Sequence, residues 1–294
     1  EGIAAEDDFL APEPASDDDV LLVHGAGYVE RLRTGALSPR EEMQMEVPYS
    51  PELVEAFWLS AGGSILATKQ ALKDGICFNL GGGFHHACPD HGEGFCVIHD
   101  VAIAIRRAQK DGLVKNVMVV DCDVHQGNGT AAIFPPQRTA SAPLPSGFGV
   151  HKETGAPSGG SVFTISLHQE HNYPSYKPPS SIDVNLPDGT TDEQYLSWLD
   201  QALSSGLRKF QPELLCYIAG ADPYKEDQLG GLALTIEGLK ERDLKLFRVA
   251  QTRDIPVMVT YAGGYARRVE DTVTIHCNTV VAAKEVAAQL KPRA

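Results

Sequence analysis

Apolar positions along the chain fall into two patterns: short runs that are apolar throughout, and longer segments with a helical period. The short runs predict five strands, at residues 76–79, 116–121, 161–168, 213–220 and 256–264. The periodic segments predict five helices, at residues 51–73, 100–112, 192–207, 236–252 and 278–290. A serine and a proline begin the first helix, and glycines end the first two, as is typical of helix termini.

The alternation of strands and helices predicts an α/β fold. Several strands are apolar on both faces, so helices must cover both sides of the sheet. We therefore expect a three-layer α/β/α arrangement with a central, mostly parallel sheet. No internal repeat is visible, and we expect one domain over residues 1–294. In such folds ligands bind beyond the carboxyl ends of the strands.

Two segments do not follow this alternation. Residues 1–20 are acidic and proline-rich, which predicts an irregular surface arm. Residues 135–160 are rich in proline, glycine and serine and have no periodicity. Loops of this length are uncommon inside compact domains, so we expect an inserted, flexible loop.

Composition narrows the class of protein. The net charge of the 294 residues is −14, which argues against direct binding of nucleic acid or anionic membranes. No apolar run approaches the roughly 20 residues of a membrane span, and no secretory leader is visible. The six cysteines are scattered and none forms a CxxC pair, so we expect reduced thiols and a cytoplasmic protein. The oligomeric state is left open.

Polar residues with metal-binding chemistry follow two of the strands. Asp121, Asp123 and His125 alternate after an apolar run, and alternate residues of a strand share a face. Asp222 follows another apolar strand. Asp123, His125 and Asp222 would form a three-ligand set with one open position, which is typical of catalytic zinc, although iron(II) or cobalt could also bind. The ion would offset the cost of burying two carboxylates.

Two further motifs have acid–base or hydrogen-bonding chemistry. His85 and His86 follow a glycine-rich turn, and imidazole titrates near neutral pH. Asp121 and Asn128 are the nearest candidates to fix their tautomers. Tyr265, in a glycine-flanked loop, could donate a hydrogen bond to a developing oxyanion.

Each motif alone also has a plain structural interpretation. Asp123 and His125 could cap a strand end, His85 and His86 could be surface loop residues, and Tyr265 could simply pack in a turn. We expect the remaining histidines of this region to be surface, capping or core residues; these are His24, His91, His99, His151 and His168.

Four blocks occur in a fixed order along the chain: "GGGFHHACPDHGEGFCVIHDVAIA", "DCDVHQGNGTA", "AGADPYKEDQLGGL" and "AGGY". Together they resemble the zinc-dependent histone deacetylase family, which has the arginase/deacetylase α/β fold. The similarity covers roughly residues 20–290. The segments "GEGFCVIHD" and "SLHQEHNYP" are similar in sequence to the bacterial and class IV branch of the family.

The resemblance implies a role for each matching residue. Asp123, His125 and Asp222 match the zinc ligands, His86 the general base and acid, and His85 the supporting histidine. Asp121 matches the partner of His85, Asn128 replaces an aspartate found in many relatives, and Tyr265 matches the oxyanion-stabilising tyrosine. Phe95 and Tyr173 match the walls of the acyl-lysine tunnel, with Gly94 and Gly263 beside the substrate. A structural potassium would be held around Asp121, Asp123, His125 and Ser166.

The implied activity is metal-assisted hydrolysis of an acyl-lysine amide. Acylated polyamines or other small acyl amides are alternative substrates. A two-metal, ureohydrolase-like enzyme and an inactive binding module are alternative functions. Relatives usually begin with a strand and a loop bearing histidine and arginine that have no counterpart here. We therefore expect an unpaired sheet edge and an altered rim of the active site.

Overall fold

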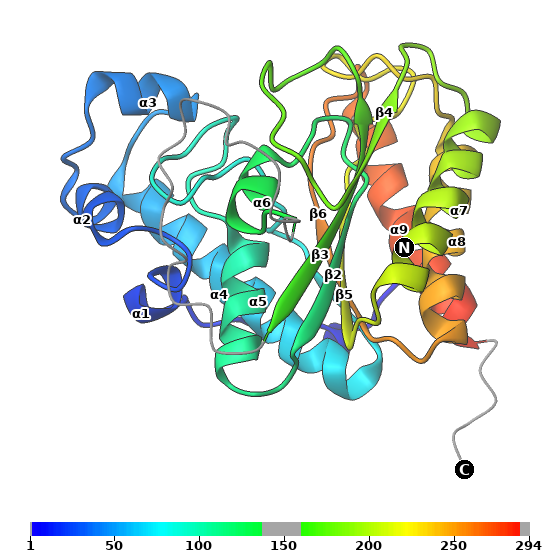
Figure 1. Ribbon diagram of the computed structural model, residues 1–294, viewed down its shortest axis with the longest axis horizontal. Helices are drawn as coiled ribbons and strands as arrows, with labels where there is room; N and C mark the ends of the chain where they lie inside the picture. Colours follow the sequence, from blue (N-terminus) through cyan, green and yellow to red (C-terminus); the bar gives the residue numbers. More distant parts are fainter. Residues whose placement is uncertain (1, 137–159, 289–294) are drawn as a thin grey trace.

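The computed structural model describes residues 2–136 and 160–288. These residues form a six-stranded sheet in which every pair of neighbouring strands is parallel, in the order β1-β6-β5-β2-β3-β4 (Figure 1). The strands are β1 Ile76–Asn79, β2 Asn116–Asp121, β3 Ser161–Gln169, β4 Ile182–Leu186, β5 Leu214–Ala219 and β6 Val257–Tyr261. The predicted α/β class and parallel sheet are confirmed.

Helices cover both faces of the sheet. The long helices α4 Pro51–Asp74 and α5 Asp100–Lys110 lie on one face (Figure 1). On the other lie α7 Asp192–Lys209, α8 Ile236–Thr252 and α9 Val269–Ala288. Strand β2 shows why both layers are needed. Val117 and Val119 pack into one core cluster, while Met118 and Val120 pack into the other. A strand that is apolar on both faces therefore separates two cores.

The N-terminal segment expected to form an irregular surface arm contains two short helices. A short 3₁₀ helix covers Glu6–Asp8, and α1 covers Asp17–Val20. Ser16 and Asp19 form a capping box at the start of α1, and Val20 is buried completely. The Trp58 indole also donates a hydrogen bond to the Asp17 carboxylate over 2.8 Å. The acidic run thus includes helix-capping residues that hold the end of this segment against α4, while residues 9–16 have no regular secondary structure.

Some elements differ from the expected set. The prediction missed the strand β4 and the helices α2 Ala26–Thr34, α3 Pro39–Met45 and α6 Asn128–Ile133. Helix α9 begins nine residues before its predicted start, since its first turns are polar and half exposed. The predicted loop 135–160 lies almost wholly outside the described residues.

Parallel pairing determines where the site lies. Strands β2 and β5 are neighbours, with Asp121 opposite Ile218, so the loops that follow them leave the same edge of the sheet side by side. Strand β1 has one neighbour, β6, within the described part of the chain. No helix among the described residues is long and apolar enough to cross a membrane.

Candidate active site

Asp123, His125 and Asp222 meet at the carboxyl edge of the sheet. One potential ligand atom from each lies within 4.8 Å of the other two. The His125 Nδ1 atom is 3.1 Å from Asp123 Oδ1 and 3.3 Å from Asp222 Oδ2. All three side chains are buried. The structure thus brings together the set expected from the sequence.

The backbone places these side chains differently from the expectation. Strand β2 ends at Asp121, so strand alternation does not extend to residues 123 and 125. Carboxylates direct the following loop instead. Asp121 Oδ1 accepts from the Asp123 amide over 3.1 Å, and Asp123 Oδ1 accepts from the His125 amide over 2.9 Å. Asp222 Oδ1 accepts from Val124 N over 2.8 Å, which links the two loops.

The chemistry of this group fits a divalent cation. Asp222 Oδ2 is buried without a hydrogen-bond partner in the described structure. Burial and the charge of Asp123 raise the pKa of Asp222 to about 7. Burial opposes a charge on His125, but the neighbouring Asp123 and Asp222 carboxylates outweigh it and raise the pKa of His125 to about 10. The cluster therefore attracts positive charge, and one nitrogen and two carboxylate donors suit zinc, iron(II) or cobalt.

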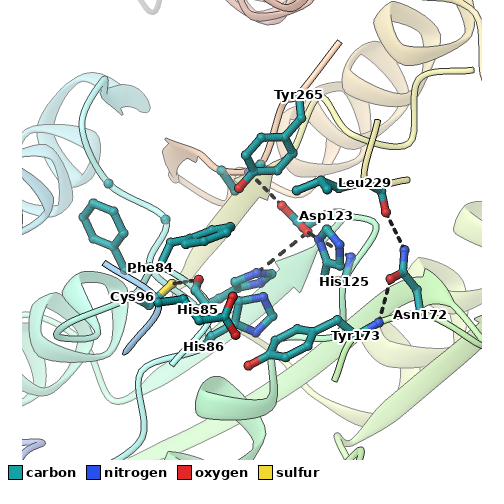
Figure 2. Close-up of a pocket in the computed structure, with 17 residues that line it drawn as sticks. Phe84, His85, His86, Cys96, Asp123, His125, Asn172, Tyr173, Leu229 and Tyr265 are labelled. Carbon is teal, nitrogen blue, oxygen red and sulfur yellow. Dashed lines mark hydrogen bonds and ion pairs between the residues drawn. The ribbon is translucent and has the colours of Figure 1, made fainter. Parts of the chain in front are cut away.

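His85 and His86 lie next to this group, with their ring centroids 4.1 Å apart (Figure 2). His85 Nδ1 is 2.7 Å from Asp121 Oδ2, and His86 Nδ1 is 2.7 Å from Asn128 Oδ1. Burial lowers the pKa of His85, but the charges of Asp121 and Asp123 outweigh it and raise it to about 9. Burial and the neighbouring His85 hold the pKa of His86 well below its usual range. These opposite shifts favour a charged His85 and a neutral His86 at neutral pH.

Tyr265 faces the same cavity from the loop after β6, opposite Tyr173 (Figure 2). The Asp227 carboxylate anchors its backbone, accepting from Tyr265 N over 2.6 Å. The same carboxylate accepts from the amides of Leu229 and Gly230. Burial raises the pKa of the Tyr265 hydroxyl, so it remains a hydrogen-bond donor at neutral pH.

A cavity of about 360 Å³ leads to these groups. Phe95 and Tyr173 form part of its wall, and the Tyr173 ring meets His86 edge-on at 4.9 Å. The backbone turns sharply here, since both Gly94 and Phe95 have a positive φ. A Cβ on Gly94 would lie 2.7 Å from His86 Cδ2, and one on Gly263 would lie 2.0 Å from Asp222 Oδ2. Both positions require glycine for the cavity to keep this shape.

Comparison with known proteins identifies the family. A family model described as "Histone deacetylase domain" matches residues 1–280. The chain belongs to the histone deacetylase family. It is 36% identical over 97% of its length to an uncharacterised protein of Picosynechococcus, covering 90% of that protein. It is also 33% identical over 93% of its length to histone deacetylase 2 of Arabidopsis thaliana, covering 68% of it.

Further matches agree with this assignment. A histone deacetylase-like amidohydrolase of Pseudomonas aeruginosa is 28% identical over 90% of the chain and 68% of the relative. Among solved structures, a histone deacetylase homologue crystallised with SAHA has a TM-score of 0.74 and 23% identity, covering 98% of this chain and 75% of that one. The structural likeness supports the fold.

Other predicted residues of this histone deacetylase family member lie farther from the cavity. Ser166 pairs in register with Asp121, and its hydroxyl lies 2.9 Å from His168 Nδ1. The potassium site expected there stays a prediction. His24, His99 and His168 are buried, and His99 caps α5 by accepting from Ala102 N. His151 lies outside the described residues.

Several residues near the site carried no signal in the sequence. Glu46 lines the cavity but belongs to no recognisable motif, and Leu229 lines it from within the third of the four ordered blocks without having been assigned a role. The buried Arg242 lies beneath the two metal-site loops, donating to the Gly220 carbonyl over 2.7 Å and to the Cys122 carbonyl over 3.3 Å. A charged residue in an amphipathic helix is normally assigned to the exposed face, so only the packed structure could reveal Arg242.

Proposed function

We propose that this protein is a metal-dependent amidohydrolase that removes acetyl or other acyl groups from lysine side chains. The main support is a single juxtaposition. Asp123 and His125 of the three-donor cation site, the neutral imidazole of His86 and the protonated Tyr265 all line one cavity. Membership of the histone deacetylase family supports the reaction class.

Asp123, His125 and Asp222 would hold the ion, with zinc as the proposed metal and iron(II) or cobalt as alternatives. When bound, such an ion supplies Lewis-acid chemistry, polarising the amide carbonyl and acidifying a water molecule. A structural potassium beside Ser166 is a further part of the proposal.

The side chains around the ion would carry the remaining steps. The neutral His86 accepts a proton from the attacking water, while its Nδ1 stays bound to Asn128. The Tyr265 hydroxyl donates a hydrogen bond to the oxygen that becomes negative. His85, kept charged by Asp121, adds positive charge nearby. A histidine then protonates the leaving amine, and a carboxylic acid and a free amine depart.

The walls would orient an acyl-lysine side chain. Phe95 and Tyr173 would contact its methylene groups and exclude water. The Glu46 carboxylate at the cavity lining favours a substrate with positive charge near the mouth, as in a basic peptide. The same feature is compatible with an acylated polyamine, so both substrate types need testing. A ureohydrolase-like centre gains no support, because the group of possible ligands at this edge of the described structure contains only Asp123, His125 and Asp222.

The decisive experiment is a panel of acyl amides assayed with metal quantification. Acyl-lysine peptides and acylated polyamines would be tested with and without a chelator. We expect turnover that tracks bound zinc and is lost in His86→Ala. Zinc-loaded, folded protein without turnover on any of these substrates would favour the binding-module alternative.

We further propose that residues 1–294 act as one catalytic domain in the cytoplasm, where the six unlinked cysteines would stay reduced.

A further inference from the structure

A chain of hydrogen bonds connects His86 to an acid that no sequence motif singles out. His86 Nδ1 lies 2.7 Å from Asn128 Oδ1, and Asn128 Nδ2 in turn donates to Glu93 Oε1. Glu93 is 15% exposed in its side chain and sits in the turn before Gly94. This series of hydrogen bonds places the negative charge of Glu93 one amide group away from the His86 imidazole.

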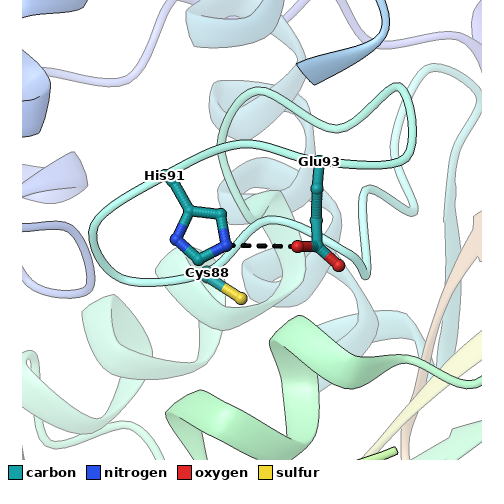
Figure 3. A group of neighbouring side chains, drawn as sticks. All are labelled: Cys88, His91 and Glu93. Atoms are coloured by element: carbon teal, nitrogen blue, oxygen red, sulfur yellow. Dashed lines mark hydrogen bonds and ion pairs between the residues drawn. The ribbon is translucent and has the colours of Figure 1, made fainter. Parts of the chain in front are cut away.

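Glu93 is held from its other side as well. His91 Nε2 lies 3.1 Å from Glu93 Oε2 (Figure 3). The Tyr173 hydroxyl donates to Glu93 Oε1 over 3.1 Å. Burial opposes the charged form, but the hydrogen bonds from His91 and Asn128 outweigh it and lower the pKa of Glu93 to about 2. Glu93 is therefore ionised across the working pH range.

The same corner contains a possible metal-ligand group, formed by Cys88, His91 and Glu93. Two observations argue against an ion there. The Nδ1 of His91 already faces the Asp90 carboxylate at 2.7 Å, so both ring nitrogens have acidic partners. Burial raises the pKa of the Cys88 thiol, which keeps it protonated. His91 is better explained as a charged donor to Glu93.

The donors and acceptors available on Glu93 and Asn128 determine the direction of each hydrogen bond in this series. An ionised carboxylate can only accept, so Asn128 must turn its Nδ2 towards Glu93 and its Oδ1 towards His86. A carbonyl oxygen can only accept as well, so His86 must carry its proton on Nδ1. The lone pair of Nε2 is left free to accept a proton.

We propose that Glu93 is a positioning residue that, through Asn128, fixes the tautomer and orientation of His86. The role of His86 as base rests on the proposed function, but its tautomer does not. The proposal also gives Glu93 a second contact, to the cavity wall through Tyr173.

The first test measures the tautomer directly, by two-bond ¹H–¹⁵N correlation spectra of the zinc-loaded chain with ¹⁵N-labelled histidine. His86 is assigned by its absence in His86→Ala. We expect a neutral ring protonated on Nδ1 in the unaltered protein. In Glu93→Gln the new amide can donate or accept, Asn128 can turn round, and the Nε2-protonated form becomes populated. An unaltered Nδ1-protonated ring in Glu93→Gln would overturn the proposal.

A charge-swap variant distinguishes this role from a loss of packing. In the double variant Asn128→Asp with Glu93→Gln, the new carboxylate at position 128 accepts from His86. The new amide at position 93 donates to that carboxylate. We expect this variant to restore the Nδ1-protonated ring. Tyr173→Phe removes the hydroxyl that donates to Glu93, and it should leave the tautomer of His86 unchanged. A double variant that resembles Glu93→Gln would contradict the mechanism.

The second test is kinetic. Glu93→Gln should lower kcat about 10-fold, the size of effect usual for groups that orient a reacting residue, with little change in KM. The acidic limb of its pH profile should move to lower pH, because losing a nearby negative charge lowers the pKa of His86. Glu42→Gln, on the exposed part of α3, is the control with unchanged kinetics. If the unaltered protein has no turnover, the proposed function fails while the tautomer spectra still decide the role of Glu93.

Discussion

At the scale of single residues, Tyr265 offers the clearest separation of binding from catalysis. Its hydroxyl faces the cavity, and burial raises its pKa, so it can donate a hydrogen bond throughout the neutral pH range. Tyr265→Phe should therefore lower kcat by roughly 10²–10³-fold, as the loss of one oxyanion donor typically does, with a smaller effect on KM. Steady-state kinetics on an acyl-lysine peptide measure this.

The matched control is Tyr261→Phe, in the strand just before. The Tyr261 hydroxyl donates to the His276 carbonyl over 3.0 Å and does not line the cavity. We expect near-normal kcat for this variant. Equal losses in both variants would indicate a general disturbance of the β6 region, in which case Tyr265 would have no special role.

His24 should make the protein sensitive to mild acid. Its Nδ1 donates to the Cys88 carbonyl and its Nε2 accepts from the His99 amide, so the folded protein requires the neutral ring. Burial lowers its pKa from 6.5 to about 4. In the unfolded chain His24 binds a proton near pH 6.5, whereas in the folded chain it does so only near pH 4. The free energy of unfolding therefore falls as the pH drops through this interval.

Urea denaturation between pH 7 and pH 5 tests this expectation. His24 alone should reduce the free energy of unfolding by about 2 kcal/mol over that range. His24→Gln should remove this part of the slope even if it lowers stability overall, whereas the exposed His171→Gln should not change it. If His24→Gln leaves the dependence of the free energy of unfolding on pH unaltered, His24 is not the group whose pKa is lowered by folding.

Whether the location of a single residue could be predicted from the sequence depends on which part of the fold positions it. Asp123 and Asp222 follow apolar strands, and parallel strands end at one edge, so their meeting could be predicted. The location of Glu93 could not. Its contact with Asn128 joins a loop to the first residue of α6, 35 positions away, and no periodic pattern encodes how that loop turns. The same holds for Asp227, which positions Tyr265 from 38 residues away.

At the scale of elements, helix α4 has a glycine pair at its centre that brings other segments unusually close. A Cβ on Gly62 would lie 1.8 Å from the Glu13 carbonyl oxygen, and one on Gly63 would lie 2.7 Å from Asn79 Oδ1. The Ala15 amide also donates to the Trp58 carbonyl over 2.9 Å. The N-terminal segment is thus packed directly on the helix backbone at residues 13–15, although these residues have no regular secondary structure.

Gly62→Ala should consequently destabilise the protein. Alanine favours a helix by about 1 kcal/mol over glycine, but the clash is with backbone atoms that cannot rotate away. We expect a net loss of about 1–3 kcal/mol in urea denaturation. Gly27→Ala in α2 is the control, since its Cβ would meet only the end of the Arg31 side chain at 3.5 Å. That variant should be neutral or slightly stabilising, and an equal gain in both would contradict the packing argument.

Elements were predictable where burial gives them a continuous pattern. Strands β2 and β5 are buried along almost their whole length and were found within a residue of their ends. Strand β4 lies at the sheet edge and is half exposed, and Asp183 and Asn185 alternate with its apolar residues. A search for runs that are apolar throughout overlooks this alternating pattern. The short helices α2 and α3 form instead from local capping, such as the Ser38–Glu41 box, which a search for long periodic segments overlooks.

At the scale of the whole molecule, the cation site lies between the loops of the two central strands. Asp123 follows β2 and Asp222 follows β5, while the buried Arg242 binds the carbonyls of residues 122 and 220 from below. Any ion held by both carboxylates therefore joins the two halves of the sheet. Binding to the folded state alone stabilises it by an amount set by the free ion concentration, about 4 kcal/mol at 1,000 times the dissociation constant.

Removing the ion should consequently lower the melting temperature as well as the activity, and the size of the shift should depend on pH. Binding requires His125 and Asp222 to lose their protons. The pKa of Asp222 is about 7 and that of His125 about 10, so lowering the pH from 8 to 6 makes protons compete more strongly at both positions. Differential scanning calorimetry at fixed free zinc should show a larger stabilisation at pH 8 than at pH 6.

Two variants make this measurement specific. Asp222→Asn removes one donor and should abolish most of the zinc-dependent shift, and it should raise the melting temperature of the zinc-free protein by relieving carboxylate repulsion. Asp200→Asn disrupts only an exposed pair with Lys245 and should keep the full shift. If zinc stabilised Asp222→Asn as strongly as the unaltered chain, the ion would be bound elsewhere, and the two central strands would not be joined through it.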